Sequence, residues 1–246
     1  MPLAVVAPVS ACLIGLIGLT GLIVGAYARA FADGFGEHPD VPLREARDAL
    51  ARATRITPLP RRPFVVEIVM AGVFGLVTWR SASGTGGPAA GVAAGVGGGV
   101  TIMTAVLLYA AAAGVTLSVI DWRTRRLPDA ITLPSYPALA VLLAPTGRLG
   151  VALLCGLALG AAYAVLWFVR PAALGLGDVK LAGLVGMVTG AVGVNAVILA
   201  AVGAHVLGAL YAVGLLITRR ATRTSEFPFG PFMLGAALFA VVLPVT

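Results

Sequence analysis

Residues 181–218 read LAGLVGMVTGAVGVNAVILAAVGAHVLGALYAVGLLIT, an apolar stretch that is punctuated mainly by glycine. An α-helix needs about 20 apolar residues to cross the hydrocarbon core of a bilayer, so this stretch is too long for a single span. We therefore predict two consecutive membrane helices, at 179–193 and 194–218, that separate between Gly190 and Gly193. This stretch decides the fold class, which we predict to be an all-α, polytopic membrane helix bundle.

The rest of the chain supports the same class. Of its 246 residues, 59% are hydrophobic and 11% are charged, and the mean hydropathy of +1.01 is far above that of soluble domains. The other apolar segments lie at 3–28, 64–79, 99–120, 130–145, 149–169 and 231–245. We therefore expect about eight transmembrane helices. Residues 1–246 would form a single integral membrane domain with a first span at 1–28, a cytoplasmic loop at 29–63 and a seven-span core at 64–246. The first span lacks the basic start of a signal peptide, so we expect it to be retained.

The basic residues predict the orientation of these spans, because cytoplasmic loops of membrane proteins collect Lys and Arg. If the N-terminus lies outside, the cytoplasmic loops hold every basic residue except Arg80 and Arg148. Trp79, Trp122 and Trp167 fall at predicted helix ends, where interfacial tryptophans are common. We therefore predict an N-out, C-out, multi-pass protein of the plasma membrane. Its net charge of +7 is then explained by topology and by anionic lipid, not by nucleic acid.

The loop at 29–63 is the only long polar stretch. Within it, Leu43, Ala46, Leu50 and Ala51 recur at helical spacing, which predicts a short amphipathic helix at 41–54 on the membrane surface. A plain solvated connector is the alternative. The loop contains no cysteine, and the only cysteines of the chain, Cys12 and Cys155, each lie inside an apolar run. Neither a disulfide framework nor a thiolate metal site is therefore predicted.

The acidic residues single out the candidate site. Most of them lie in polar loops, where a charge costs little, but four lie next to or inside predicted spans: Glu67, Asp121, Asp129 and Asp178. A carboxylate near the bilayer is expensive and therefore indicates a function. Asp121 follows an apolar run at the C-terminal end of a predicted helix, where the helix dipole disfavours a negative charge. The alternative explanation for Asp121 is an ion pair with one of the arginines that follow it.

Asp178 and Lys180 lie in a second polar motif at the start of a predicted span. The glycines of Gly175-Leu-Gly177 allow positive φ or a close backbone approach, either of which would point Asp178 into the bundle. A helix N-cap worth about 1 kcal/mol is the alternative role for Asp178. Lys180 is the only lysine of the chain, which suggests a specific need for an ammonium group. The alternative is a lysine that extends to the membrane interface by chance.

These motifs resemble those of the prepilin peptidase family of membrane aspartyl peptidases. Residues 121–129, DWRTRRLPD, resemble the first aspartate motif of that family, and residues 175–181, GLGDVKL, resemble its second motif, G-x-G-D-x-K-L. Residues 227–232 resemble the segment before its last helix, and residues 62–67 resemble the start of its second helix. The resemblance implies that Asp121 and Asp178 are catalytic. It also implies a supporting set formed by Gly175, Gly177, Lys180, Pro128, Asp129 and Glu67.

The function implied by the resemblance is cleavage of a basic leader from type IV prepilin or pseudopilin precursors at the cytoplasmic membrane face. Many members of the family also carry Cys-x-x-Cys pairs in the first loop, a region associated with N-methylation that uses S-adenosylmethionine. Because residues 29–63 lack cysteine, the methyltransferase activity is not implied for this chain. The peptidase itself is expected to need neither a cofactor nor a metal. A second copy of the chain, forming a homodimer, is a further candidate partner.

The chemistry expected of two facing carboxylates is that they share one proton and titrate as a unit. The helix ends favour an ionised Asp178 and a protonated Asp121. Two alternatives remain: a cation or proton-coupled transporter that uses intramembrane aspartates, and an inactive relative that serves as an assembly scaffold. The arginines around Asp121 would also oppose the attraction of a basic leader. His205, inside an apolar helix, is predicted to be a hydrogen-bonded core residue.

Overall fold

The computed structural model describes residues 8–35, 42–54, 64–82, 102–171, 174–219 and 227–243, and within these ranges it contains helices and no strand. The helices are α1 (Pro8–Ala32), α2 (Pro42–Thr54), α3 (Val65–Ala82), α5 (Ile102–Thr124), α6 (Asp129–Leu143), the 3₁₀ turn η1 (Ala144–Thr146), α7 (Leu149–Val169), α8 (Leu176–Val192), α9 (Val194–Ile217) and α10 (Gly230–Val242).

Five of the described helices, α1, α3, α5, α7 and α9, are long and apolar enough to cross a membrane. The helices α6, α8 and α10 are shorter, with 15, 17 and 13 residues. Large apolar side chains such as Leu154 and Leu157 are exposed on the outside of the bundle, as expected of a protein surrounded by lipid. The all-α membrane class is therefore confirmed, whereas the count of eight spans and the N-out, C-out orientation stay predictions.

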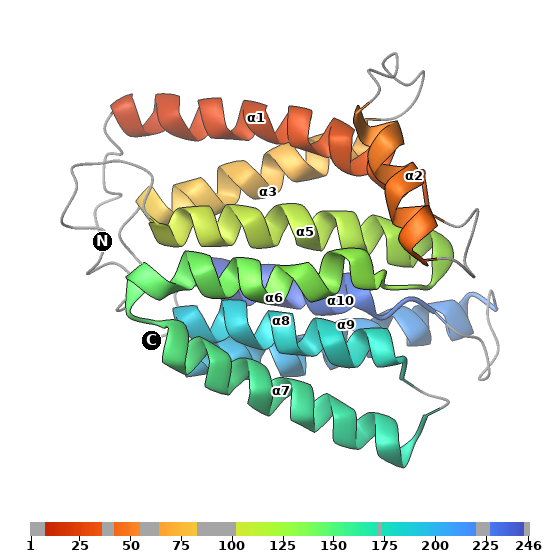
Figure 1. Ribbon diagram of the computed structural model, residues 1–246. Helices are drawn as coiled ribbons and strands as arrows, with labels where there is room; N and C mark the ends of the chain where they lie inside the picture. The colour runs from red at the N-terminus through yellow and green to blue at the C-terminus, as the bar shows by residue number, and fades with distance from the viewer. Residues whose placement is uncertain are drawn as a thin grey trace.

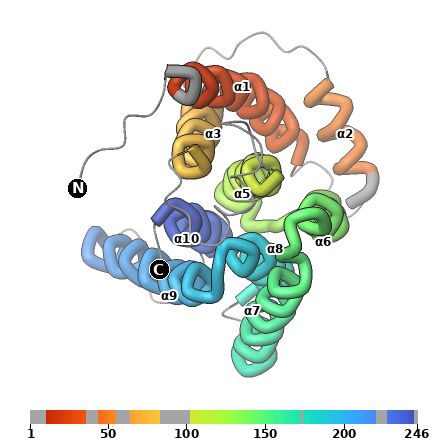
Figure 2. The backbone as a smooth tube through the Cα atoms, turned by 90° about the vertical axis from the view of Figure 1, so that its left-hand side faces the viewer, coloured from red at the N-terminus to blue at the C-terminus, as the bar shows by residue number. Residues whose placement is uncertain are grey.

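The long helices run side by side in alternating directions, and α2 lies across one end of the bundle (Figure 1). The view along the bundle shows α5 in the middle, with α1 and α3 on one side and α6, α8 and α10 on the other (Figure 2). The core helix α8 buries every residue from Leu181 to Met187. Because the helices alternate in direction, the end of α5 and the starts of α8 and α10 lie at the same end of the bundle (Figure 1).

Small residues bring neighbouring helices into close contact. A Cβ atom added at Gly186 of α8 would lie 2.6 Å from the backbone oxygen of Cys155 in α7. One added at Gly156 of α7 would lie 2.8 Å from the backbone oxygen of Gly183. Packing between membrane helices depends on such close backbone approach, because lipid tails are as apolar as the side chains. The α7–α8 pair is therefore held together mainly by contacts that larger residues would prevent.

The predicted segment limits differ from the observed helices by a few residues. The break between the last two long apolar segments is confirmed at Gly193, where α8 ends and α9 begins. By contrast, α5 continues to Thr124 and α8 begins at Leu176. Asp121 and Asp178 therefore lie inside these helices. The hydropathy pattern alone places both residues just beyond the apolar segments. The charged turns at these ends still satisfy helical hydrogen bonds, although hydropathy alone assigns them to loops.

The predicted amphipathic helix is confirmed as α2, whereas its place on the membrane surface stays a prediction. Ala49 and Ala53 are buried, and the backbone of Ala49 packs directly on Gly34. Leu50, which we assigned to the apolar face, is 58% exposed. Small residues occupy the side of α2 that packs on the end of α1, because the two backbones lie too close together for a leucine to fit between them.

Candidate functional site

Asp121 lies in the last turn of α5 and is 5% exposed. Its Oδ2 atom accepts a hydrogen bond of 2.9 Å from the backbone N–H of Gly230, the first residue of α10. The alternative of an ion pair with the following arginines is wrong for the part of the chain that the structure describes, because Arg123 pairs with Asp33 at the end of α1. Asp121 is therefore a buried carboxylate that is held by a backbone amide.

Asp178 lies in the first turn of α8 and is partly buried. Its Oδ2 atom accepts a hydrogen bond of 3.1 Å from the backbone N–H of Gly175. Gly175 is the N-cap of the helix, so the alternative that Asp178 itself is the N-cap is wrong. The carboxylate at the third helical position reaches back to the N-cap amide, as the acidic residue of a capping box does. One of its oxygen atoms is thereby fixed, and no hydrogen bond within the described residues involves the other.

The two carboxylates converge although they come from different helices. Gly230, whose amide binds Asp121, is also a point at which α8 packs. Leu181, one turn after Asp178, is also close, since its Cδ2 atom is 3.5 Å from the position of a Cβ atom at Gly230. The C-terminal end of α5 therefore meets the N-terminal ends of α8 and α10 at this point. The partial charges of these ends differ in sign, so the two carboxylates lie in different local fields.

The glycines of the second motif act through size and not through unusual backbone angles. Gly175 has φ −80° and ψ 151°, an extended conformation that other residues also adopt, so the expectation of positive φ is wrong there. Gly177 lies within α8, and a Cβ atom at this position would be 3.0 Å from the Cβ atom of Leu127. Gly177 therefore allows the first turn of α8 to pack against the connection between α5 and α6, which is the close approach that the sequence predicted.

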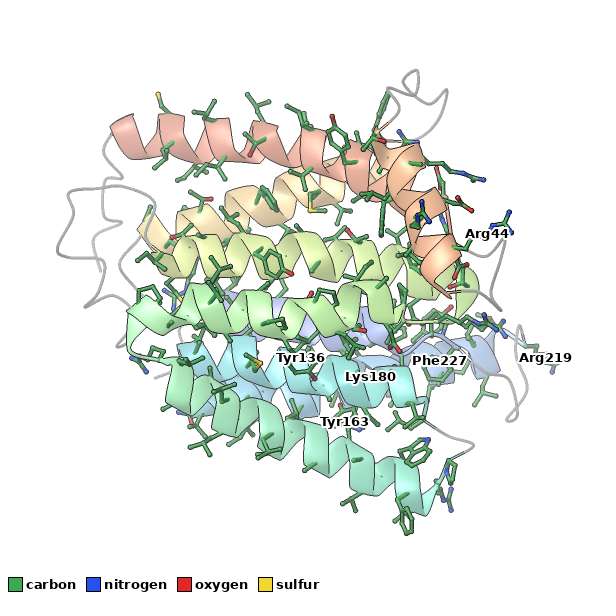
Figure 3. All side chains as sticks on the ribbon, in the orientation of Figure 1. Arg44, Tyr136, Tyr163, Lys180, Arg219 and Phe227 are labelled. Atoms are coloured by element: carbon green, nitrogen blue, oxygen red, sulfur yellow. The ribbon has the colours of Figure 1, made fainter. Side chains whose placement is uncertain are left out.

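Lys180 does not reach the pair of aspartates but holds α8 against α6. Its ammonium group donates a hydrogen bond of 2.6 Å to Asp129, the first residue of α6, directly after the N-cap Pro128. The hydroxyl of Tyr136 donates a bond of 2.7 Å to the backbone oxygen of Lys180. Figure 3 shows both labelled side chains between α6 and α8. Lys180 and Asp129 thus support the position of the turn that carries Asp178.

Glu67 belongs to a separate ion-pair network. It is 4% exposed and accepts a hydrogen bond of 2.7 Å from Arg29 of α1. Arg29 also lies 3.8 Å from Asp33, which pairs with Arg123 in the last turn of α5. Removing one partner of a buried ion pair usually costs about 3–5 kcal/mol, because the other charge stays uncompensated. Glu67 therefore joins α1 to α3 and is not brought to the pair of aspartates.

A largely apolar cavity of about 630 Å³ lies beside the site. It is lined by residues of α3, α5, α6, α8 and α10 together with Arg29. Leu117 and Leu181 lie in its wall, and Leu181 is also the residue that approaches Gly230 next to Asp121. The cavity thus runs through the apolar interior of the bundle and comes near the buried carboxylate at Leu181, with neither Asp121 nor Asp178 in its wall.

Two parts of the site were missed by the sequence reasoning. The first is the backbone amide of Gly230, although the segment 227–232 that contains it was noted as a motif. The second is Tyr163 of α7, which is 2% exposed and belongs to the core cluster against which Val179, the residue after Asp178, packs. A single tyrosine inside the apolar run 149–169 was the only available signal. His205, predicted as a core residue, is exposed, but it does bond to the backbone of Ala201.

The comparisons with known proteins agree with the motifs. Neither the curated proteins nor the solved structures gave a match to this chain. The family model described as the type IV leader peptidase family matches residues 108–213. The matched segment contains Asp121 and Asp178 as well as the Lys180–Asp129 pair. The resemblance to the prepilin peptidases is thereby confirmed: over residues 108–213 this multi-pass helical membrane protein is similar to the type IV leader peptidase family.

Proposed function

We propose that this chain is a membrane aspartyl endopeptidase that removes the basic leader from type IV prepilin-like precursors, with Asp121 and Asp178 as its catalytic pair. The observation that carries the proposal is that the last turn of α5 with Asp121 and the first turns of α8 with Asp178 both pack at Gly230, inside the segment that matches the leader peptidase family. A family of this kind implies a peptidase, and the third acidic residue of the described segment 108–213, Asp129, is paired with Lys180.

The proposed reaction is a direct hydrolysis without a covalent intermediate. Asp178, at the positive end of α8, is the ionised partner and takes a proton from a water molecule whose oxygen attacks the scissile carbonyl carbon. Asp121 is the protonated partner, with the proton on Oδ1 because Oδ2 is occupied by the amide of Gly230. It donates to the carbonyl oxygen. The C–N bond then breaks as a proton passes to the leaving nitrogen, which leaves a carboxylate and a new amino terminus.

The arrangement suits a substrate that is cut at the membrane surface. The described basic residues gather at the end of the bundle where α5 ends and α8 begins, as Arg44 and Arg219 illustrate in Figure 3. By contrast, Arg80 and Arg148 lie at the opposite helix ends. This distribution supports the N-out, C-out orientation and a cytoplasmic site in the plasma membrane. The apolar cavity beside Asp121 would accept side chains of the apolar helix that follows the leader.

The paired arginines explain how a basic leader can approach this end of the bundle. The sequence suggested that the arginines would repel it. In the structure, Arg123 pairs with Asp33 and Arg29 pairs with Glu67, so the positive charges of these two arginines are compensated. The carboxylate of Asp178 then remains as an uncompensated negative charge for the leader to approach.

The other candidate functions receive less support. A transporter would place its aspartates near the middle of the bilayer, whereas Asp121 and Asp178 lie in the terminal turns of their helices. The proposed hydrolysis uses no cofactor and no metal. S-adenosylmethionine would be required only if the chain also methylates the new amino terminus.

The proposal is tested by co-expressing a prepilin-like precursor with the wild type, Asp121→Asn or Asp178→Asn and following removal of the leader in isolated membranes. Asparagine keeps the size of each side chain but removes the ionisable group. Asp48→Asn is the matched control, because the Asp48 side chain of α2 is 48% exposed and its ion pair with Arg44 is long, at 4.0 Å. All variants must be present in the membrane at similar levels.

We expect both site variants to lose at least about 99% of the processing rate, which corresponds to the loss of a general acid or base, and the control to keep the wild-type rate. Normal cleavage by either site variant would remove that aspartate from the mechanism. Absence of cleavage by the wild type with a panel of precursors would reject the function itself and favour the scaffold alternative.

A further inference from the structure

The hydroxyl group of Tyr163 is buried without a hydrogen-bond partner. The residue is 2% exposed, and its Oη atom neither donates to nor accepts from any of the residues that the structure describes. Two partly buried tyrosines of the bundle differ in this respect, since Tyr109 donates to Ser135 and Tyr136 donates to the backbone of Lys180. A buried hydroxyl without a partner costs free energy, because it gives up its hydrogen bonds to water on folding.

The ring that carries this hydroxyl is held in place from three helices. Tyr163 belongs to α7, and its ring centroid lies 5.6 Å from that of His205 in α9 and 6.4 Å from that of Phe229. Phe229 directly precedes Gly230, whose amide binds Asp121. The position of the hydroxyl is therefore tied to the same segment that fixes Asp121. In Figure 3, Tyr163 lies between α7 and α8.

Tyr163 packs next to the first turn of α8, which carries Asp178. A Cβ atom added at Gly160, one turn before Tyr163, would lie 3.9 Å from the backbone oxygen of Val179, the residue after Asp178, and Val179 packs against the same core cluster as Tyr163. No hydrogen bond joins the Tyr163 hydroxyl to a described residue, so the hydroxyl has a proton to donate at this end of α8. A phenylalanine at this position would keep the ring contacts without the cost of a buried, unpaired hydroxyl. Stability alone therefore does not explain why a hydroxyl points to this place, next to one of the two proposed catalytic carboxylates.

We propose that Tyr163 is a third catalytic residue, whose hydroxyl donates a hydrogen bond to the carbonyl oxygen of the scissile peptide bond beside Asp178. The inference rests on the proposed peptidase function. As the water attacks, negative charge develops on this oxygen, and a donor that is already in place stabilises it more than it stabilises the ground-state carbonyl. Tyr163 stays neutral in the reaction and transfers no proton, so the proton balance of the two aspartates is unchanged.

The test compares Tyr163→Phe with the wild type in steady-state cleavage of a purified prepilin-like precursor by the full-length protein in detergent. We expect kcat to fall by about 10- to 100-fold with KM within about threefold, because the lost bond is strongest in the transition state. The thermal melting temperature should be unchanged or higher, because only an unpaired hydroxyl is removed. Tyr27→Phe, at an exposed tyrosine of α1, is the matched control and should keep the wild-type kcat.

The outcomes separate this inference from the proposed function. Wild-type kcat in Tyr163→Phe, together with cleavage by the wild type that Asp178→Asn abolishes, would overturn the role of Tyr163 alone. A loss of activity that follows a lowered melting temperature would assign the hydroxyl to folding and would also overturn it. If the wild type cleaves no precursor, the proposed function and the role of Tyr163 fall together.

Discussion

Replacing Gly230 by alanine should impair catalysis while leaving the fold intact. A Cβ atom at Gly230 would lie 2.7 Å from Oδ2 and 3.3 Å from Cγ of Asp121. Ordinary contacts of this kind begin at 3.4 Å, so the carboxylate oxygen has to move by about 0.7 Å. That displacement also disturbs the hydrogen bond from the amide of Gly230. The added methyl group therefore acts directly on the position of one proposed catalytic carboxylate.

The cost to folding should be small for two reasons. The atom that is displaced is the end of a side chain, and the other close atom, Cδ2 of Leu181, lies at an ordinary distance of 3.5 Å. Alanine also favours a helical conformation over glycine by about 0.5–1 kcal/mol. We therefore expect the free energy of unfolding to change by less than about 1 kcal/mol. A displacement of about 0.7 Å in a catalytic group should lower kcat/KM by about 10- to 100-fold.

The assay measures precursor cleavage and thermal melting of purified Gly230→Ala in detergent. Gly214→Ala is the matched control, because Gly214 also lies in a helix but an added Cβ atom there has no neighbour within 4 Å. The control should keep wild-type activity. Wild-type cleavage by Gly230→Ala would refute the view that the position of Asp121 matters for the reaction. A large fall in melting temperature would show that the packing at Gly230 cannot adjust as we reason.

Two further substitutions test the supports of the site. Gly186→Ala places a methyl group 2.6 Å from a backbone oxygen of α7, which cannot move aside as a side chain does. In a detergent melt it should destabilise the protein by about 1–3 kcal/mol relative to Gly150→Ala, where an added Cβ atom has no neighbour within 4 Å. Equal melting temperatures of the two variants would contradict the close α7–α8 packing. Asp129→Asn weakens the ion pair between Asp129 and Lys180, in which the aspartate side chain is 50% exposed and the lysine side chain is 36% exposed. It should therefore change stability by less than about 1 kcal/mol and the cleavage rate by less than tenfold. A hundredfold loss of cleavage at an unchanged melting temperature would instead give Asp129 a part in the chemistry.

The sequence by itself determined the membrane class, the approximate positions of the helices and the identity of the two candidate carboxylates. Apolar segments of this length have no stable place in water, and hydropathy alone therefore locates them. The separation of 181–218 at Gly193 follows from the same argument. Asp121 and Asp178 stand out because charges are rare next to apolar segments, and both lie within residues 108–213, which match the leader peptidase family. These properties depend on local composition and order along the chain.

Only the tertiary structure decided which groups meet. The amide that binds Asp121 comes from Gly230, far along the chain, and Lys180 turned out to pair with Asp129 and not with either of the two candidate carboxylates. Glu67 joined the ion pairs of α1, and Tyr163 of α7 packed next to the first turn of α8. Hydropathy does not encode such contacts, because they depend on the directions in which packed helices turn their faces. Small residues such as Gly177 and Gly186 set those distances, and their effect exists only once two helices lie against each other.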